Sequence, residues 1–461
     1  ANALQLDWNE VVPAERLSYI LGNPPFVGKK EQTVEQKEAF RKVTEGIPSS
    51  GLLDFVTAWY VQAARMMRDT AIRCAFVSTN SICQGEQVGI LWRWMLDQGM
   101  HLFFAHRTFQ WSNEARGKAA VHCVIVGFAA EDIAPKWLFE YEHSKSDPQR
   151  LGVRQINPYL VEGPNVLLSS RRTPLCAVME MTKGNEATDS GHLVLSEQER
   201  DILAAAEPQA TPWIRAFLGG EDFLNGGKRW CLWLVGIEPG QLATMPAVLK
   251  RVDNVRKFRE KSSKAATVAK AKTPFLFGEL RQPNQGTMIV VPKVSSERRD
   301  YAPLGFVDSS VILNNTLQFI PNGTLYEFGV IQSLMHMAWM RAVAGRMKSD
   351  YQYSIKIVFN NFPWPEGPTD RQREAIERAA QVVLGARDQF SGSSLANLYD
   401  PLTMPPVLLR AHQTLDRAVD AAYGRRDFAS EAERVAFLFD LYQRCAAQSA
   451  AAPGTGQARS A

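Results

Sequence analysis

Apolar residues along the first 130 positions alternate between strand-like and helix-like spacing. Short apolar runs typical of buried strands occur at 17–21, 74–80, 101–109 and 119–130. Between them, apolar residues recur at helical spacing over 54–69 and 85–99. This alternation predicts an α/β domain with a largely parallel, helix-covered sheet. Because no helical segment separates the last two strands, we expect them to form an antiparallel pair at one edge.

After about residue 145 the pattern becomes irregular, with frequent prolines and glycines. One clear helical segment, 246–262, interrupts short β-like runs at 165–169, 229–235, 287–292, 311–315 and 317–320. Helical spacing dominates from residue 325 onward. We therefore expect an α/β domain at 1–145, an α+β domain at 146–324, a helical region at 325–445 and a disordered tail at 446–461.

The composition, 45% hydrophobic and 22% charged, is ordinary for a globular protein. No apolar run reaches the roughly 18 residues that span a membrane, and no signal-peptide pattern opens the sequence. The six cysteines are scattered and form no CxxC pair. We expect a cytoplasmic protein with buried thiols, no membrane partner and no metal site.

Net charge is only +4, but positive charge is concentrated in one segment. Between residues 250 and 272, nine Lys and Arg residues stand against Asp253 and Glu260. Two interpretations fit this excess: the solvated face of a helix, or a surface that binds a polyanion.

The tetrapeptide Asn23-Pro24-Pro25-Phe26 follows the first apolar run, which ends at Gly22. Each proline fixes its own φ and removes a backbone donor. The segment is therefore a rigid loop that offers carbonyl acceptors. In an open α/β sheet, the loop after a strand's carboxyl end lies where ligands bind.

An exocyclic amino group suits such a loop. The Asn23 side-chain oxygen and the Pro24 carbonyl can accept its two hydrogens and direct the nitrogen lone pair at an electrophile. Phe26 can stack on the ring, and base stacking of this kind contributes roughly 1–3 kcal/mol. That would offset much of the cost of extruding a base from a duplex. The other interpretation is a proline-stiffened surface turn.

ILGNPPF resembles motif IV of the amino-methyltransferases that use S-adenosylmethionine to methylate adenine N6. Further segments resemble the MmeI-like (type IIL) restriction–modification enzymes, which carry gamma-type DNA methyltransferases: GLLDFVTAWYVQAA, AFVSTNSICQGEQVGILW, FLNGGKRWCLWL, FGELRQPNQ, VPKVSSERR, LMHMAWMRAVAGRMKSDYQYS and NNFPWP. The resemblance extends to about residue 440. It implies that 1–145 is the second half of a methyltransferase domain, that 146–324 recognises target DNA and that 325–445 supports it.

The resemblance also implies roles for single residues. Asn23 and Pro24 would accept the N6 hydrogens of a flipped adenine, Pro25 would rigidify the loop, and Phe26 would stack on the base. Phe109 resembles a second aromatic that packs on the base; Trp111 is the rival candidate, and an ordinary core position for Phe109 remains open. Asp54 is expected to cap the helix that follows it.

Contacts with double-stranded DNA are implied for the recognition domain, together with sequence-independent attraction by the basic helix. The candidates are Arg281, Lys293, Ser295, Ser296, Arg298, Arg299, Lys348, Tyr351 and Tyr353.

The family's glycine-rich FxGxG loop, which binds S-adenosylmethionine, does not occur before Asn23. We therefore expect a fragment of a site-specific adenine DNA methyltransferase of a type II restriction–modification system. It would lack the cofactor-binding half and the nuclease, would be inactive alone, and would have the N-terminal remainder of its parent as a partner.

Two alternatives stay open: a non-catalytic DNA-binding specificity module, and a protein-glutamine N5 methyltransferase, whose substrate amide makes the same demand on the loop. A cytosine C5 enzyme is disfavoured because the chain contains no Pro-Cys pair.

Overall fold

The computed structural model describes residues 2–111, 121–141, 146–347 and 349–451. The chain divides into two compact units. The first unit comprises Ala1–Cys176, Ala338–Pro363 and Phe428–Ala461; the second comprises Ala177–Met337 and Trp364–Asp427. This division differs from the expected domains, because residues 146–176 belong to the first unit and the helical region after 325 is shared between both.

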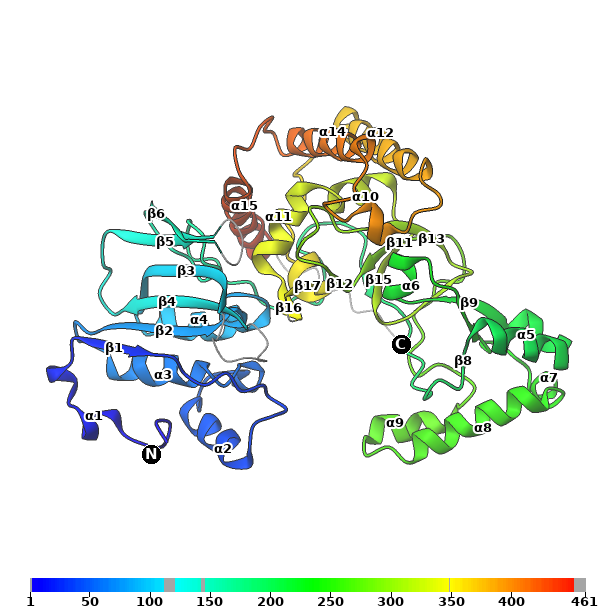
Figure 1. Cartoon of the computed structure of the whole chain (residues 1–461), viewed down its shortest axis with the longest axis horizontal. Coiled ribbons are helices and arrows are strands. Elements are labelled where there is room, and N and C mark those ends of the chain that lie inside the picture. The colour runs from blue at the N-terminus through cyan, green and yellow to red at the C-terminus, as the bar shows by residue number, and fades with distance from the viewer. Residues whose placement is uncertain (1, 112–120, 142–145, 348, 452–461) are drawn as a thin grey trace. The chain divides into compact units, whose positions relative to one another are not determined.

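A six-stranded sheet forms the centre of the first unit, in the order β1-β2-β4-β3-β5-β6 (Figure 1). Its strands are β1 (Tyr19–Gly22), β2 (Arg73–Thr79), β3 (His101–Trp111), β4 (Val121–Ala129), β5 (Lys136–Glu140) and β6 (Gln149–Val153). The sheet is mixed, since only β1–β2 and β3–β5 are parallel, so the expectation of a largely parallel sheet was wrong. The expected antiparallel pair of β3 and β4 is present, but its expected place at an edge was wrong. β4 is inserted between β2 and β3, and β5 and β6 extend the sheet beyond them.

The helices of the first unit confirm two of the periodic segments. They are α1 (Trp8–Val11), α2 (Val34–Val43), α3 (Thr57–Met66), α4 (Glu86–Asp97) and α15 (Glu431–Ala451), with 3₁₀ turns at Ala14–Arg16, Ser50–Leu52 and Asn80–Cys83. α3 and α4 correspond to the segments expected at 54–69 and 85–99. α15 continues to Ala451, past residue 446, where the tail was expected to start.

Tyr60 of α3 is the centre of the core on one face of this sheet. Its ring stacks on Phe128 of β4 and meets Phe76 of β2 edge-on, each with centroids 5.3 Å apart. Its hydroxyl lies 2.8 Å from the Ser78 hydroxyl, so the buried polar atom is satisfied. Trp92 of α4 packs edge-on against the same ring. These contacts hold α3 and α4 against β2 and β4.

The segments of the first unit that come later in the chain pack around Trp339. This residue lies on α11 (Leu334–Val343), which crosses the boundary between the units. Its indole N–H donates to the Val358 carbonyl at 2.9 Å, and its ring meets Phe362 and, from α15, Phe439. A short hairpin of β16 (Gly345–Met347) and β17 (Asp350–Gln352) and a π-helical turn at Ile355–Phe359 complete this part.

Two four-stranded sheets form the second unit, in the orders β14-β9-β10-β8 and β13-β11-β15-β7. Their strands are β7 (Thr182–Lys183), β8 (Val194–Leu195), β9 (Ile214–Leu218), β10 (Arg229–Leu232), β11 (Thr287–Pro292), β13 (Gly305–Asp308), β14 (Ile312–Leu313) and β15 (Leu317–Pro321); β12 (Val294–Ser295) is a further short strand. Each sheet has its own apolar cluster, around Cys231 and Val248 and around Val290 and Phe319. Of the expected β-like runs, only 165–169 forms no strand.

The helices of the second unit are α5 (Glu197–Ala206), α6 (Gly220–Asn225), α7 (Pro239–Ala243), α8 (Pro246–Glu260), α9 (Ala265–Ala269), α10 (Leu325–Ile331), α12 (Asp370–Asp388), α13 (Leu395–Leu398) and α14 (Pro406–Ala422), with 3₁₀ turns at Pro208–Trp213 and Lys270–Lys272. α8 confirms the helix expected at 246–262. In the described part of the chain, no helix is both long and apolar enough to cross a membrane.

Candidate functional site

The acceptor loop, residues 23–26, leaves the carboxyl end of β1. Asn23 is exposed, and its side chain has no hydrogen-bond partner among the described residues; Pro24 is buried and Phe26 half-buried. A Cβ on the preceding Gly22 would lie 3.2 Å from the Phe76 ring, so the strand end packs closely on this ring. The loop is thus anchored behind Asn23, while the amide remains free for a ligand.

A hydrogen-bonded group ties the neighbouring loops together at the same edge of the sheet. The Ser81 hydroxyl, just after β2, donates to the Asp54 carboxylate and lies 2.8 Å from the Thr79 hydroxyl. The Asp54 N–H donates to Gln87 Oε1 of α4 at 2.9 Å. Asp54 does not cap α3, whose N-cap is Val56 without a side-chain bond, so that expectation was wrong. Instead, Asp54 fastens the segment between the acceptor loop and α3.

Phe109 lies at the same carboxyl end of the sheet as the acceptor loop, but on the distant strand β3. Thr79 of β2 lies opposite Cys123 of β4, which in turn lies opposite Phe109 of β3. In the order β1-β2-β4-β3, β1 and β3 are therefore separated by three strand spacings, roughly 14 Å. The Phe109 ring stacks on Tyr141 with centroids 5.3 Å apart. The side chain of the rival, Trp111, lies outside the described residues. The structure therefore does not bring Phe109 together with the acceptor loop.

His106 belongs to the same aromatic cluster as Phe109. It stacks on Phe139 with centroids 4.2 Å apart and an interplanar angle of 2°, and its Nδ1 lies 2.8 Å from the Tyr141 hydroxyl. Burial lowers the pKa of His106, because the charged form loses hydration. The surroundings of this histidine therefore favour its neutral form.

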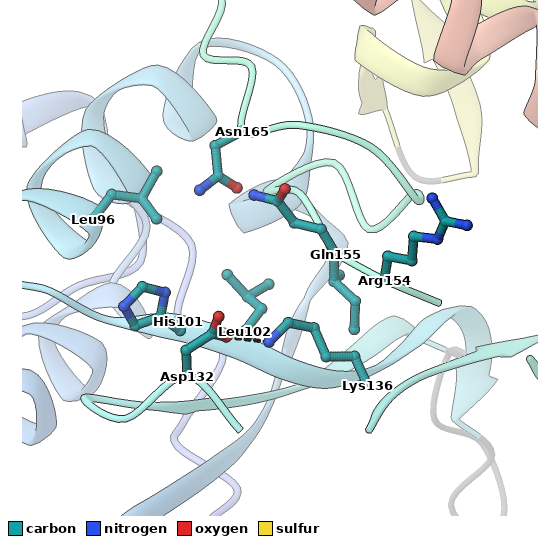
Figure 2. A pocket seen from close by; sticks show the side chains of 9 residues that line it. Leu96, His101, Leu102, Asp132, Lys136, Arg154, Gln155 and Asn165 are labelled. Carbon is teal, nitrogen blue, oxygen red and sulfur yellow. Dashed lines mark hydrogen bonds and ion pairs between the residues drawn. The ribbon is translucent and has the colours of Figure 1, made fainter. Parts of the chain in front are cut away.

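A cavity of about 240 Å³ lies at the opposite end of the sheet (Figure 2). It is lined by Leu96, His101, Leu102, Asp132, Lys136, Arg154, Gln155, Ile156 and Asn165. His101 and Lys136 begin the parallel strands β3 and β5, so the cavity opens at the amino ends of these strands. Lys136 is paired with Asp132 and also donates to the Ile133 carbonyl at 3.0 Å. The cavity is separate from the acceptor loop, which lies at the carboxyl end.

Arg281, one of the residues expected to contact DNA, has a fixed backbone and a partly exposed side chain. The buried amide of Asn185 accepts hydrogen bonds from the Arg281 N–H at 2.7 Å and the Gln282 N–H at 3.1 Å, which fixes the backbone. The Arg281 guanidinium is partly exposed and donates to Glu279 at 2.7 Å. Hydrogen bonds from Lys183 and Arg281 lower the pKa of Glu279 to about 2. The Arg281 side chain is thus held at the surface with donors to spare.

The other expected DNA contacts differ in accessibility. Arg298 is exposed, with its guanidinium 3.6 Å from Asp400, whereas Lys293, Ser296 and Arg299 are half-buried. Ser295, Tyr351 and Tyr353 are only 4%, 6% and 4% exposed, and Arg346 covers the Tyr351 ring at 4.1 Å. Their assignment as direct DNA contacts is therefore not supported, because surrounding protein covers them. Lys348 lies outside the described residues.

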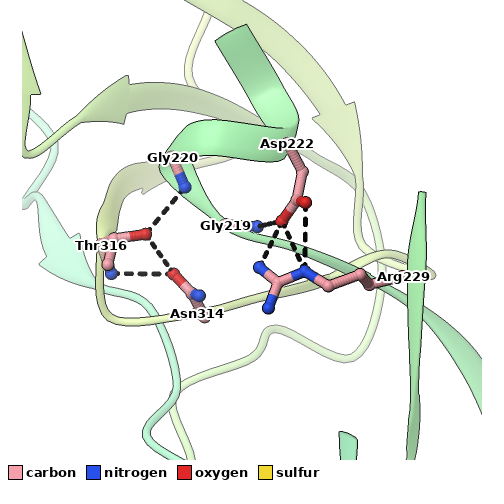
Figure 3. Close-up of polar contacts among 6 residues, drawn as sticks. All are labelled: Gly219, Gly220, Asp222, Arg229, Asn314 and Thr316. Atoms are coloured by element: carbon pink, nitrogen blue, oxygen red, sulfur yellow. Dashed lines mark hydrogen bonds and ion pairs between the residues drawn. The ribbon is translucent and has the colours of Figure 1, made fainter. Parts of the chain in front are cut away.

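Arg229, in the segment FLNGGKRW, takes part in a network of hydrogen bonds within the second unit (Figure 3). Arg229 Nε lies 3.0 Å from both carboxylate oxygens of Asp222, which also accepts the Gly219 N–H at 2.8 Å. The Gly220 N–H donates to the Thr316 hydroxyl at 2.7 Å. A Cβ on Gly219 would lie 2.7 Å from the Arg229 guanidinium, so a larger residue there would require this side chain to move. The positive charge of Arg229 is therefore compensated by the Asp222 carboxylate.

Sequence patterns did not reveal the roles of Asn185 and Ser81. Asn185 acts on residues almost 100 positions away, and Gln282 completes the pair by accepting from Asn185 Nδ2 at 3.0 Å. The quoted segments FGELRQPNQ and AFVSTNSICQGEQVGILW contain Gln282 and Ser81, but no local spacing indicates their partners.

Comparison with known proteins gives consecutive matches along the chain. Residues 1–140 match the family model "MmeI, DNA-methyltransferase domain", 162–366 match "MmeI, target recognition domain", and 368–449 match "MmeI, C-terminal domain". "DNA methyltransferase A" of Bacillus subtilis (strain 168) is 39% identical over 446 residues, covering 96% of this chain and 50% of that protein.

Among solved structures, the type IIL restriction–modification enzyme MmeI in complex with DNA is 46% identical, with a TM-score of 0.90. The match covers 97% of this chain and 60% of that one. The chain thus spans about half the length of its curated relative and somewhat more of the solved enzyme. From these matches, the chain belongs to the MmeI-like family and contains methyltransferase, target-recognition and C-terminal domains in that order.

Proposed function

We propose that this chain belongs to a restriction–modification DNA methyltransferase that recognises a specific duplex sequence and methylates adenine at N6. The observation that carries the proposal is the acceptor loop. Asn23 is exposed without a hydrogen-bond partner among the described residues, next to a backbone stiffened by Pro24 and Pro25. The match to a target recognition domain over 162–366 favours DNA over a protein glutamine as the substrate.

Each residue of the acceptor loop has a role in binding a base that is flipped out of the duplex. With the adenine out of the duplex, Asn23 Oδ1 and the Pro24 carbonyl accept the two N6 hydrogens. Two fixed acceptors draw the nitrogen toward tetrahedral geometry and direct its lone pair away from the ring. Phe26 stacks on the base and offsets part of the cost of extrusion. Pro25 holds these groups in register.

S-adenosylmethionine would supply the methyl group, but the described residues alone do not form a site for it. β1 is an edge strand, and its Tyr19 and Leu21 are 61% and 74% exposed. In the described part of the chain, no glycine before Gly46 has a positive φ, so no glycine turn of the cofactor-binding type precedes the acceptor loop. We derive from this chain only the binding and orientation of the base.

Recognition of the duplex is assigned to the second unit. Arg281, on its fixed backbone, is the proposed base-edge contact, since an Arg with free donors can bond guanine O6 and N7. Lys293, Ser296, Arg298 and Arg299 are proposed phosphate contacts. The described residues also fit a second role, a DNA-specificity module that binds duplex without S-adenosylmethionine.

The test is Asn23→Ala in the full-length protein, with N6-methyladenine measured by mass spectrometry and duplex binding by gel shift. We expect methylation to fall by about 10²–10³, as when a preorganised hydrogen-bonding group is removed, with DNA binding retained. The exposed Asn225→Ala is the matched control and should behave as wild type. Retained methylation in Asn23→Ala would overturn the assigned role.

A further inference from the structure

The basic arm, residues 246–276, comprises α8, α9 and the 3₁₀ turn that follows (Figure 1). Not all of its cations face solvent as free charges. Arg251 pairs with Glu199 at 2.8 Å, Lys257 pairs with Asp253 at 2.6 Å, and Arg256 pairs with the same aspartate. These three charges are compensated within the protein.

A second group of cations in the arm has no such compensation. Lys250, Lys261, Lys264, Lys270 and Lys272 have no ion-pair partner among the described residues. All but the half-buried Lys270 are exposed. Glu260 is the only acidic residue of the arm besides Asp253. The uncompensated charge is therefore concentrated at the end of α8 and in the turns that follow.

Arg259 fixes the shape of this part of the arm. Its side chain is fully buried, and all five of its N–H donors reach backbone carbonyls. Nε donates to Thr188 at 2.9 Å, Nη1 to Lys270 at 2.9 Å and Thr273 at 3.1 Å, and Nη2 to Ala187 at 2.9 Å and Leu276 at 2.8 Å. With no donor left, Arg259 cannot also contact a ligand.

The Arg259 contacts tie the end of α8 to the turn at Lys270–Lys272. The lysines between them are thereby carried on a backbone that is folded in advance. A preorganised cationic surface loses less conformational entropy when it binds. Lysines lack the planar fork that distinguishes one base from another, so they suit phosphates rather than base edges.

We propose that the basic arm binds the phosphate backbone of duplex DNA independently of base sequence, through Lys261, Lys264 and Lys272. Arg259 is a positioning residue that presents them. This inference rests on the proposed DNA recognition by the second unit. It separates the sequence-independent part of binding from the base contacts assigned to Arg281.

The experiment compares two triple variants of the full-length protein by fluorescence anisotropy, with a duplex of arbitrary sequence and a series of NaCl concentrations. The first is Lys261→Ala/Lys264→Ala/Lys272→Ala. The matched control, Arg371→Ala/Arg410→Ala/Arg417→Ala, removes the same charge from exposed positions on α12 and α14. Circular dichroism checks that both variants fold.

For the lysine variant we expect the slope of log K against log [salt] to become shallower by about 2 to 3. Affinity near 0.1 M salt should fall by roughly tenfold or more. The control should keep the wild-type slope. Equal slopes for wild type and the lysine variant would overturn the role of the arm, and equal losses in both variants would reduce it to an effect of net charge. Failure of the wild-type protein to bind any duplex would instead overturn the proposed DNA recognition itself.

Discussion

The acceptor loop of the first unit and the basic arm of the second differ in how directly their sequences specify their chemistry. In the loop, two proline rings fix the backbone, so the order Asn-Pro-Pro-Phe already determines which acceptors are presented. In the arm, the charge of a residue does not determine its use. Arg251 and Arg256 are paired with acids, and Arg259 is buried on carbonyls.

The contrast follows from the range of the interactions. Covalent restraints act between neighbours, whereas Glu199, the partner of Arg251, and Thr188, one of the partners of Arg259, lie more than 50 positions earlier. A count of cations therefore overstates the surface available to a polyanion. A motif such as Asn-Pro-Pro-Phe does not mislead in this way, because its backbone is fixed by its own residues.

The largest expected effect concerns stability, at Arg259. Arg259→Met removes five hydrogen bonds in a buried site and leaves the Thr188 and Leu276 carbonyls without a donor among the described residues, so the free energy of unfolding should fall by more than about 3 kcal/mol in urea denaturation. Arg256→Met is the matched control, because its exposed pair with Asp253 should add little to the stability of the fold. If both variants lose the same small amount, the carbonyl contacts do not hold the arm together.

The second prediction distinguishes the two aromatic candidates of the first unit. Phe26→Ala should lower kcat/KM for N6 methylation by roughly 10- to 100-fold, the equivalent of one stacked base. Phe109→Ala should leave it within about twofold of wild type, because the ring stacks on Tyr141 and lies about three strand spacings away. A larger loss for Phe109→Ala would show that the base lies across the whole carboxyl edge of the sheet.

Local periodicity was sufficient to predict the helices α3, α4 and α8 and the strands on either side of them, because each element buries one face that is set by the spacing of its own apolar residues. It could not place β4 between β2 and β3, since strand order depends on contacts far apart in sequence. The same limit applies to single residues. Ser295, Tyr351 and Tyr353 have polar groups suited to DNA, but tertiary packing buries them. The loop residues 23–26 were placed correctly at a strand's carboxyl end because strand and loop are adjacent.

The third prediction concerns the support behind the acceptor loop. Ser81→Ala removes the hydroxyl that bonds the Asp54 carboxylate, so the segment leading into α3 loses one of its ties. We expect a loss of about 1 kcal/mol in stability and a several-fold lower kcat with duplex affinity unchanged. The exposed Ser391→Ala, in the second unit and outside the basic arm, serves as the control. An unchanged kcat would mean that the loop holds its geometry without Asp54.

The smallest expected effect is a pH dependence at Glu279. Its folded pKa is about 2, lowered first by Lys183 and then by Arg281, below the unfolded value near 4.5. A depressed carboxyl pKa stabilises the fold fully above the unfolded pKa, and the contribution is lost as pH falls toward the folded value. The difference in unfolding free energy between wild type and Glu279→Gln should be constant from pH 6 to 8 and smaller at pH 3. Because the side chain is 29% exposed, the difference should stay below about 1 kcal/mol and shrink in 1 M salt. A difference that grew on acidification would mean that Glu279 is protonated in the native pair, and Arg281 would then be held by its backbone contacts with Asn185 alone.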